Sequence, residues 1–207
     1  MRRVHRTLWS LVAALSLLTG AACRALVEPE APDFVEYGWE LFAEGDLLGA
    51  LGQFKNGVGT GTAKVGGDPN YADGWNGQGW AYARLGIGDT SVTRFTTALN
   101  KTATTMVATE LLAGRSFASL AEGDFVTSVS DAKAARDSTA NWVFSRDITI
   151  TDDHLTLTVA TAYYGQAEYD SCLTWIRKWD DTFSTDVTTL AGRSRLAERL
   201  ESRKSEI

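Results

Sequence analysis

The sequence is poor in the residues that most often build metal centres and disulfide scaffolds. Its 207 residues contain 2 histidines and 2 cysteines. Two cysteines cannot form a disulfide-dense scaffold, and two histidines leave little for a histidine-based zinc site. We therefore expect neither a metal nor a cofactor.

An excess of basic charge is also missing. Lysine and arginine number 20 against 26 aspartates and glutamates, so the formal net charge is −6. This balance disfavours a nucleic-acid-binding protein that works by neutralising phosphates. The 7 Trp, 6 Tyr and 8 Phe residues argue against wholesale disorder, because they need a core to bury them. The length suggests one domain or two very small ones.

A long hydrophobic run is lacking too, but a short one lies near the start. Residues 1–6 carry three arginines and no acid, and residues 7–18 are mostly apolar. This run is shorter than the roughly 20 residues that a membrane-spanning helix needs. A basic segment, a short apolar segment and the small residues Gly20-Ala21-Ala22 together predict a signal peptide over residues 1–22.

Cys23 follows directly after those small residues. The arrangement resembles the lipobox of bacterial lipoproteins, although Gly20 stands where that family prefers leucine. The resemblance implies cleavage before Cys23, lipidation of its sulfur and attachment to a membrane through that lipid. The open alternative is an ordinary secretory signal with an incidental cysteine. Arg24 replaces the aspartate that retains some lipoproteins at the inner membrane, which favours the outer membrane.

Cleavage would change the charge of the protein. It removes three arginines and no acid, so the net charge falls from −6 to −9. An acidic body of this kind should not lie flat on an anionic membrane. Residues 23–33 form a short stretch with two prolines and no periodic pattern, and we expect them to act as the lipidated tether.

The body of the chain shows a repeated pattern. Each unit has a helical stretch with a small residue near its middle, then a turn, then a second helical stretch with another small residue. The spacing between the two small residues is the same in every unit, which predicts one shared helical hairpin. The small residues of the first stretches are Gly38, Gly79, Ser116 and Ala160, and those of the second are Ala50, Ser91, Ser128 and Cys172.

The clearest unit runs from Asp68 to Asn100. It resembles the tetratricopeptide repeat, whose signature is W-x2-L-G-x2-Y followed by A-x3-F. Trp75, Gly79, Tyr82 and Phe95 match it, while Gln78 replaces the Leu and Ser91 the Ala. The resemblance implies an all-α protein, a right-handed α-solenoid of about four such hairpins. The repeat domain is expected over residues 34–180, and residues 181–207 are expected to form a connection and a C-terminal capping helix.

One segment allows two interpretations. Residues 144–159 alternate apolar and polar side chains and are rich in Thr and Ile, which is typical of a β-hairpin around Asp152-Asp153. The competing interpretation starts a helix at Asp152 or Asp153 and runs it to Tyr164. We favour the helix, because the stretch that follows fits the second half of a repeat.

No arrangement typical of catalysis is apparent. The G-x-S-x-G elbow, the P-loop and the calcium-loop pattern are all absent. His154 is expected to be solvated or to cap a helix, and Cys172 to be a small core residue. A carboxylate pair of the glycosidase kind stays open as a minor alternative. We therefore expect a protein that is not an enzyme.

The resemblance also implies a binding face. In tetratricopeptide arrays the first helices line the concave side, and an aromatic groove there suits extended peptides. The alternative is that these aromatics simply form the core. The candidate groove residues are Trp39, Phe42, Asn76, Trp80, Arg84, Phe117 and Tyr164.

Two functions follow from this interpretation. The first is a membrane-anchored, periplasm- or surface-facing scaffold that binds another protein or peptide of the bacterial cell envelope. The alternative is an accessory lipoprotein that binds a glycan or another small ligand, with Trp39 and Trp80 as stacking platforms.

Overall fold

The computed structural model describes residues 28–63 and 65–207. The predicted signal peptide and Cys23 lie outside these residues. Within them the regular structure is entirely helical, apart from one isolated antiparallel bridge between Val143 and Thr151. The prediction of an all-α protein is confirmed for the described part of the chain.

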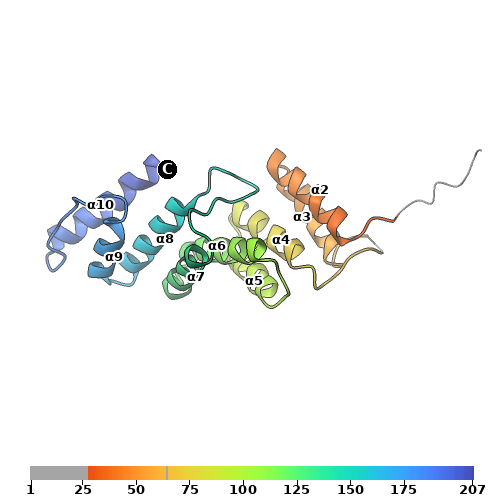
Figure 1. The fold of residues 1–207 in the computed structure, drawn as a ribbon, viewed down its shortest axis with the longest axis horizontal. Helices are drawn as coiled ribbons and strands as arrows, with labels where there is room; N and C mark the ends of the chain where they lie inside the picture. Colours follow the sequence, from red (N-terminus) through yellow and green to blue (C-terminus); the bar gives the residue numbers. More distant parts are fainter. Residues whose placement is uncertain (1–27, 64) are drawn as a thin grey trace, which may run out of the picture.

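The helices follow one another as pairs along an arc (Figure 1), and each packs chiefly against its neighbours in the sequence. The last described helix, α10, packs on α8 and α9 at the end of the arc. Short turns join the members of each pair, whereas longer segments join α3 to α4 and α7 to α8. The described helices are α2 (Ala31–Glu44), α3 (Leu47–Gly57), α4 (Ala72–Arg84), α5 (Gly88–Leu99), α6 (Thr105–Ala121), α7 (Phe125–Ser138), α8 (Asp152–Gly165), α9 (Tyr169–Ile176) and α10 (Leu190–Glu206).

The four pairs turn at equivalent positions. The residue after the first helix of each pair, or one position later, has a positive φ: 85° at Gly45, 73° at Gly86, 80° at Gly123 and 59° at Ala167. Each of these lies seven residues after the small residue predicted for that first helix. All eight predicted small residues are buried. The shared spacing in the sequence therefore corresponds to a shared geometry.

Large side chains of the second helices fill the space between pairs. The Phe54 ring lies against Gly38 of its own pair and Gly77 of the next, where a Cβ would come within 2.6 Å and 2.4 Å of it. The Phe95 ring lies in the same way against Gly79 and Gly114, at 2.5 Å and 2.3 Å. The glycines let a phenylalanine ring sit directly on two helix backbones, so the pairs pack closely.

Replacing one of these glycines tests the close packing. Gly79→Ala should destabilise the protein by about 1–3 kcal/mol, because the new methyl group overlaps the buried Phe95 ring. Gly52→Ala is the matched control, since Gly52 is exposed in the middle of α3 with nothing near it. It should stabilise by up to about 1 kcal/mol through helix propensity. Urea denaturation measures both changes, and equal effects would contradict the packing.

Residues 144–159, for which the sequence allows two interpretations, form a turn followed by a helix. Helix α8 begins at Asp152, as favoured, and Thr151 donates its backbone N–H to His154 Nδ1 at 3.2 Å. The capping role of His154 is thus confirmed. The alternative prediction of a β-hairpin around Asp152-Asp153 is wrong, because both residues lie in α8. A hairpin-like turn lies just before the helix. Phe144 donates its N–H to the Ile150 carbonyl at 2.9 Å, and Asp152 to that of Trp142 at 2.8 Å.

The two ends of the chain differ in detail from the prediction. Helix α2 begins at Ala31, so Pro32 lies in its first turn rather than in the tether, where its fixed φ suits a helix start. Leu196 and Leu200 of α10 are buried in a smaller cluster with Cys172 and Ile176, as an amphipathic final helix requires. Leu190 is exposed. None of the helices in the described part is long and apolar enough to cross a membrane.

Candidate functional site

The candidate site is the inner face of the arc, and a segment of the chain itself lies on it. We call residues 139–151, between α7 and α8, the strap. In Figure 1 the strap leaves the row of helices and reaches towards α2 and α4. Its side chains contact α2, α4 and α6, three helices that are distant from it in the sequence.

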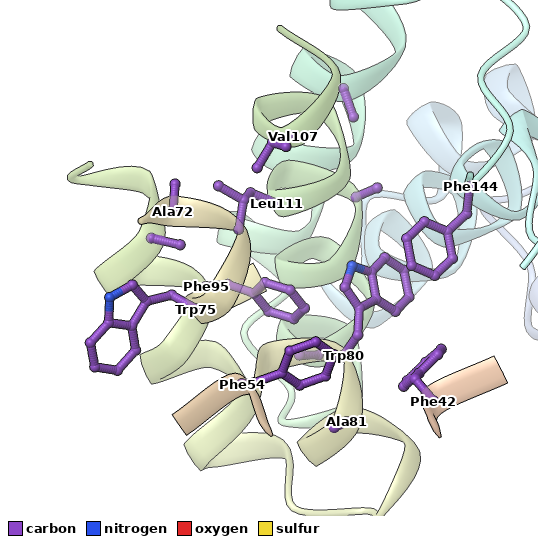
Figure 2. Close-up of a cluster of buried hydrophobic side chains, with 14 of the residues drawn as sticks. Phe42, Phe54, Ala72, Trp75, Trp80, Ala81, Phe95, Val107, Leu111 and Phe144 are labelled. Atoms are coloured by element: carbon purple, nitrogen blue, oxygen red, sulfur yellow. The ribbon is translucent and has the colours of Figure 1, made fainter. Parts of the chain in front are cut away.

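Phe144 is the central contact of the strap. Its side chain is 0% exposed, and its ring stacks on the indole of Trp80 with centroids 4.1 Å apart and planes 18° apart. Trp39 approaches the same ring edge-on, at 6.1 Å and 74°. Figure 2 shows Phe144 beside Trp80, with Phe42 nearby. An aromatic ring that is fully buried among other rings contributes a large share of the local core.

The rings on the helices connect this contact to the rest of the core. Trp80 packs edge-on against Phe95 at 5.8 Å and Phe117 at 6.0 Å. Trp39 packs likewise against Phe42 at 5.4 Å and Phe54 at 4.9 Å. The inner face is therefore continuous with the glycine-phenylalanine packing between the helix pairs.

A buried polar network runs beside the rings. Asp73 accepts hydrogen bonds from the Trp39 indole N–H at 3.0 Å and from Asn76 Nδ2 at 3.1 Å. The same Asn76 nitrogen donates to Glu110 at 3.0 Å, and the hydroxyl of Ser145 donates to Glu110 at 2.6 Å. The network thus links α2, α4, α6 and the strap.

Charged strap residues meet opposite charges on α4. Arg146 lies 3.6 Å from Asp73 and 5.0 Å above the Trp39 ring. Asp147 forms an ion pair with Arg84. Arg84 in turn lies 5.4 Å from the centre of the Phe42 ring. The order of charges on the strap is therefore complementary to the order on the helix.

The electrostatics of the site centre on Glu110. Burial raises the pKa of this carboxyl above its ordinary value, and the hydrogen bonds from Ser145 and Asn76 oppose the shift in part. At the outer edge, hydrogen bonds from Thr149 lower the pKa of Asp147, and Arg84 adds to this effect. Burial thus disfavours the charged form of Glu110, while hydrogen bonds favour the charged form of Asp147.

The structure brings six of the seven predicted groove residues to this face. Tyr164 lies elsewhere, in the smaller cluster with Tyr169, whose ring is 5.4 Å away. Trp39 and Trp80 are each only 3% exposed, because the strap covers them. In this conformation they cannot act as stacking platforms for a sugar. Trp39, Phe42 and Trp80 belong to the hydrophobic core, as the alternative interpretation of these aromatics held, and the strap covers them.

The residues that cover this face were not predicted from the sequence. The sequence pattern of residues 144–147 predicts only their secondary structure. It also does not mark Asp73 or Glu110 as part of the site. A local signal existed in the run of an aromatic residue, a hydroxyl, a cation and an anion. Nothing in that run indicates which helices it contacts.

A shallow depression of about 350 Å³ lies at the outer end of the strap. It opens between the strap and the last turns of α2 and α4. Ile148 at its edge is 77% exposed. The lining residues are Phe42, Ala43, Arg84, Ser145, Arg146, Asp147 and Ile148.

The other candidate reactive residues have structural roles. Cys172 is fully buried, and burial raises the pKa of its thiol to about 12, so it is a protonated core residue at neutral pH. Burial lowers the pKa of His154, whose Nδ1 is engaged with the backbone at the start of α8. Across residues 28–63 and 65–207, no group of three His, Cys, Asp or Glu side chains is placed to hold a metal ion.

Comparison with known protein families finds no family that matches the chain, and no curated protein matches its sequence.

Removing the Phe144 ring tests how strongly the strap is held. Phe144→Ala should lower the free energy of unfolding by about 3–5 kcal/mol, the usual loss for a fully buried phenylalanine. The control is Ile148→Ala on the exposed part of the same strap, which should change it by less than about 0.5 kcal/mol. Thermal and urea denaturation measure both. A small effect of Phe144→Ala would mean that the strap is not part of the core.

Replacing Glu110 tests the buried carboxyl. Its pKa is higher in the folded protein than the ordinary 4.5, so between these two values the folded state holds more protons than the unfolded state. Raising the pH through this window therefore lowers the free energy of unfolding. Glu110→Gln should remove this loss, so the variant should gain stability relative to the unsubstituted protein as the pH rises above 4.5.

Urea denaturation of both proteins between about pH 4.5 and pH 7.5 measures the difference. His154 has a lowered pKa and gives the opposite slope, with stability rising as the pH rises through its window. It is present in both proteins, so its effect cancels in the comparison. Parallel pH profiles for the two proteins would show that Glu110 titrates as an ordinary exposed carboxyl.

Proposed function

We propose that this protein is a lipid-anchored α-helical repeat scaffold that binds another protein of the bacterial cell envelope. We further propose that its helix pairs form a right-handed solenoid of four tetratricopeptide-like hairpins, with α10 as the cap. The observation that carries this proposal is the equivalence of the four pairs. Their turns and their buried small residues recur at the same offsets, although the units differ in length.

The inner face supports binding to a protein rather than catalysis. It combines aromatic rings with a few placed charges, which is the composition of peptide-recognition surfaces. The buried carboxyl of its network, Glu110, accepts hydrogen bonds from Ser145 and Asn76 and is covered by the strap. No specific observation favours the glycan-binding alternative, because Trp39 and Trp80 are buried.

The membrane anchor is the part of the proposal that comes from the sequence. A body of net charge −9 gains nothing from contact with anionic lipids, so its attachment would depend on the lipid on Cys23. The outer membrane is the favoured location.

Replacing the two cysteines in turn tests the anchor. Cys23→Ser should abolish incorporation of labelled fatty acid and release the protein from washed membranes, because the acyl chains attach to that sulfur. Cys172→Ala is the matched control and should leave both unchanged, since Cys172 is buried in the core. Fractionation of cells that express each form measures the result. A Cys23→Ser protein that stays with washed membranes would contradict lipid anchoring.

Crosslinking in intact cells tests the scaffold function. The lipidated protein should recover one defined envelope protein, and the released Cys23→Ser form should recover less of it. Recovery of no envelope protein by a folded, membrane-attached chain would contradict the proposal.

A further inference from the structure

The strap contacts the inner face as a bound peptide would. Four consecutive residues, 144–147, each reach a different partner: Phe144 the aromatic rings, Ser145 a carboxyl, Arg146 an acid and Asp147 a cation. The backbone hydrogen bonds that the structure gives for residues 142–150 stay within the strap or reach the start of α8. Across the described residues, attachment to α2, α4 and α6 therefore runs through side chains.

The inner face is complementary to this order of groups. The ring position lies between Trp39 and Trp80, where stacking and edge-on contacts favour an aromatic side chain. Two residues further on, Asp73 and the face of the Trp39 ring receive a guanidinium group. A planar cation suits that position, because it can pair with the carboxylate and stack on the indole at the same time.

The strap leaves part of the face unpaired. The side-chain oxygen of Asn76 and the indole N–H of Trp80, both on α4, are buried without a hydrogen-bond partner. Each such atom costs free energy, because it has lost its bonds to water without replacing them. Asn76 and Trp80 are both more than nine-tenths buried. With the strap in place, these polar groups of α4 therefore stay unsatisfied.

We propose that the inner face is a recognition site for a short peptide segment that presents an aromatic side chain followed, two residues on, by an arginine. The strap is the chain's own copy of that segment, and the partner's segment binds by displacing it. This proposal rests on the scaffold function proposed above and names the chemistry of its partner.

The covalent attachment of the strap to α7 and α8 explains why the strap would occupy the inner face in the absence of a partner. Because α7 and α8 attach it at both ends, its effective concentration at the face is on the order of millimolar. A separate peptide must overcome that competition, so its apparent affinity for the unsubstituted protein is reduced. Weakening the strap should therefore raise the affinity for a peptide added in trans.

A labelled peptide of residues 142–149 tests this directly. Its binding is measured by fluorescence anisotropy to the full-length protein and to an open variant, Phe144→Ala with Arg146→Ala, in the same detergent. The open variant should bind at least about tenfold more tightly, because its own strap no longer competes. The same peptide with alanine at positions 144 and 146 should bind neither protein.

A second variant guards against loss of folding. Arg146→Gln with Asp147→Asn removes the strap's charges and leaves the Phe144 ring in place, and it should bind the peptide with intermediate affinity. Circular dichroism shows which variants are folded. Failure of a folded variant to bind the peptide, equal affinity of all forms, or equal binding of the alanine peptide would each overturn the proposal.

The outcome is separable from that of the scaffold function. Crosslinking of the same variants in cells reads the envelope partner without the peptide. Recovery of a partner by a folded variant that does not bind the peptide would leave the scaffold standing and remove this recognition site. Peptide binding without recovery of any envelope partner would support the recognition site and contradict the scaffold function.

Discussion

The stack of Phe144 on Trp80 is the contact on which the inner face of this protein depends. Trp80 sits at the junction of two helix pairs, against Phe95 and Phe117. Without Phe144, the face would expose two tryptophan rings and the buried network that joins Asp73 to Glu110. Large exposed aromatic surfaces mark binding sites or aggregation hazards. One segment between α7 and α8 thus completes the core at this face.

The helix pairs were predictable because their information is local and repeated. Small residues at a fixed spacing, such as Gly38 with Ala50 and Gly79 with Ser91, predict close helix contacts wherever they occur. The ring of Phe95 between Gly79 and Gly114 shows the physical basis of this pattern. A pattern of this kind fixes which helices pair, since each contact joins neighbours in the chain.

The strap was not predictable for the opposite reason. Phe144 and Trp80 are far apart in the sequence, and no repeat or spacing relates them. The alternation of residues 142–144 does reflect burial, since Trp142 and Phe144 are buried while Val143 is exposed. Periodicity indicates which of these side chains are buried, but not which helices they are buried against. Trp39, Phe42 and Trp80 consequently lie together in the core beside the strap and Tyr164 lies in the other cluster, while the strap itself was not predicted.

The central claim is that the strap is docked on the inner face in the resting protein. Hydrogen exchange of the backbone amides of Phe144 and Asp152 measures this, because Phe144 is fully buried against Trp80 and both N–H groups are bonded to carbonyls of the strap that Phe144 anchors. In a docked strap these amides should exchange at least about a hundredfold more slowly than in an unstructured peptide, and the strap should open at a lower free energy than global unfolding requires. Exchange of these amides at the rate of a free loop would contradict the central claim.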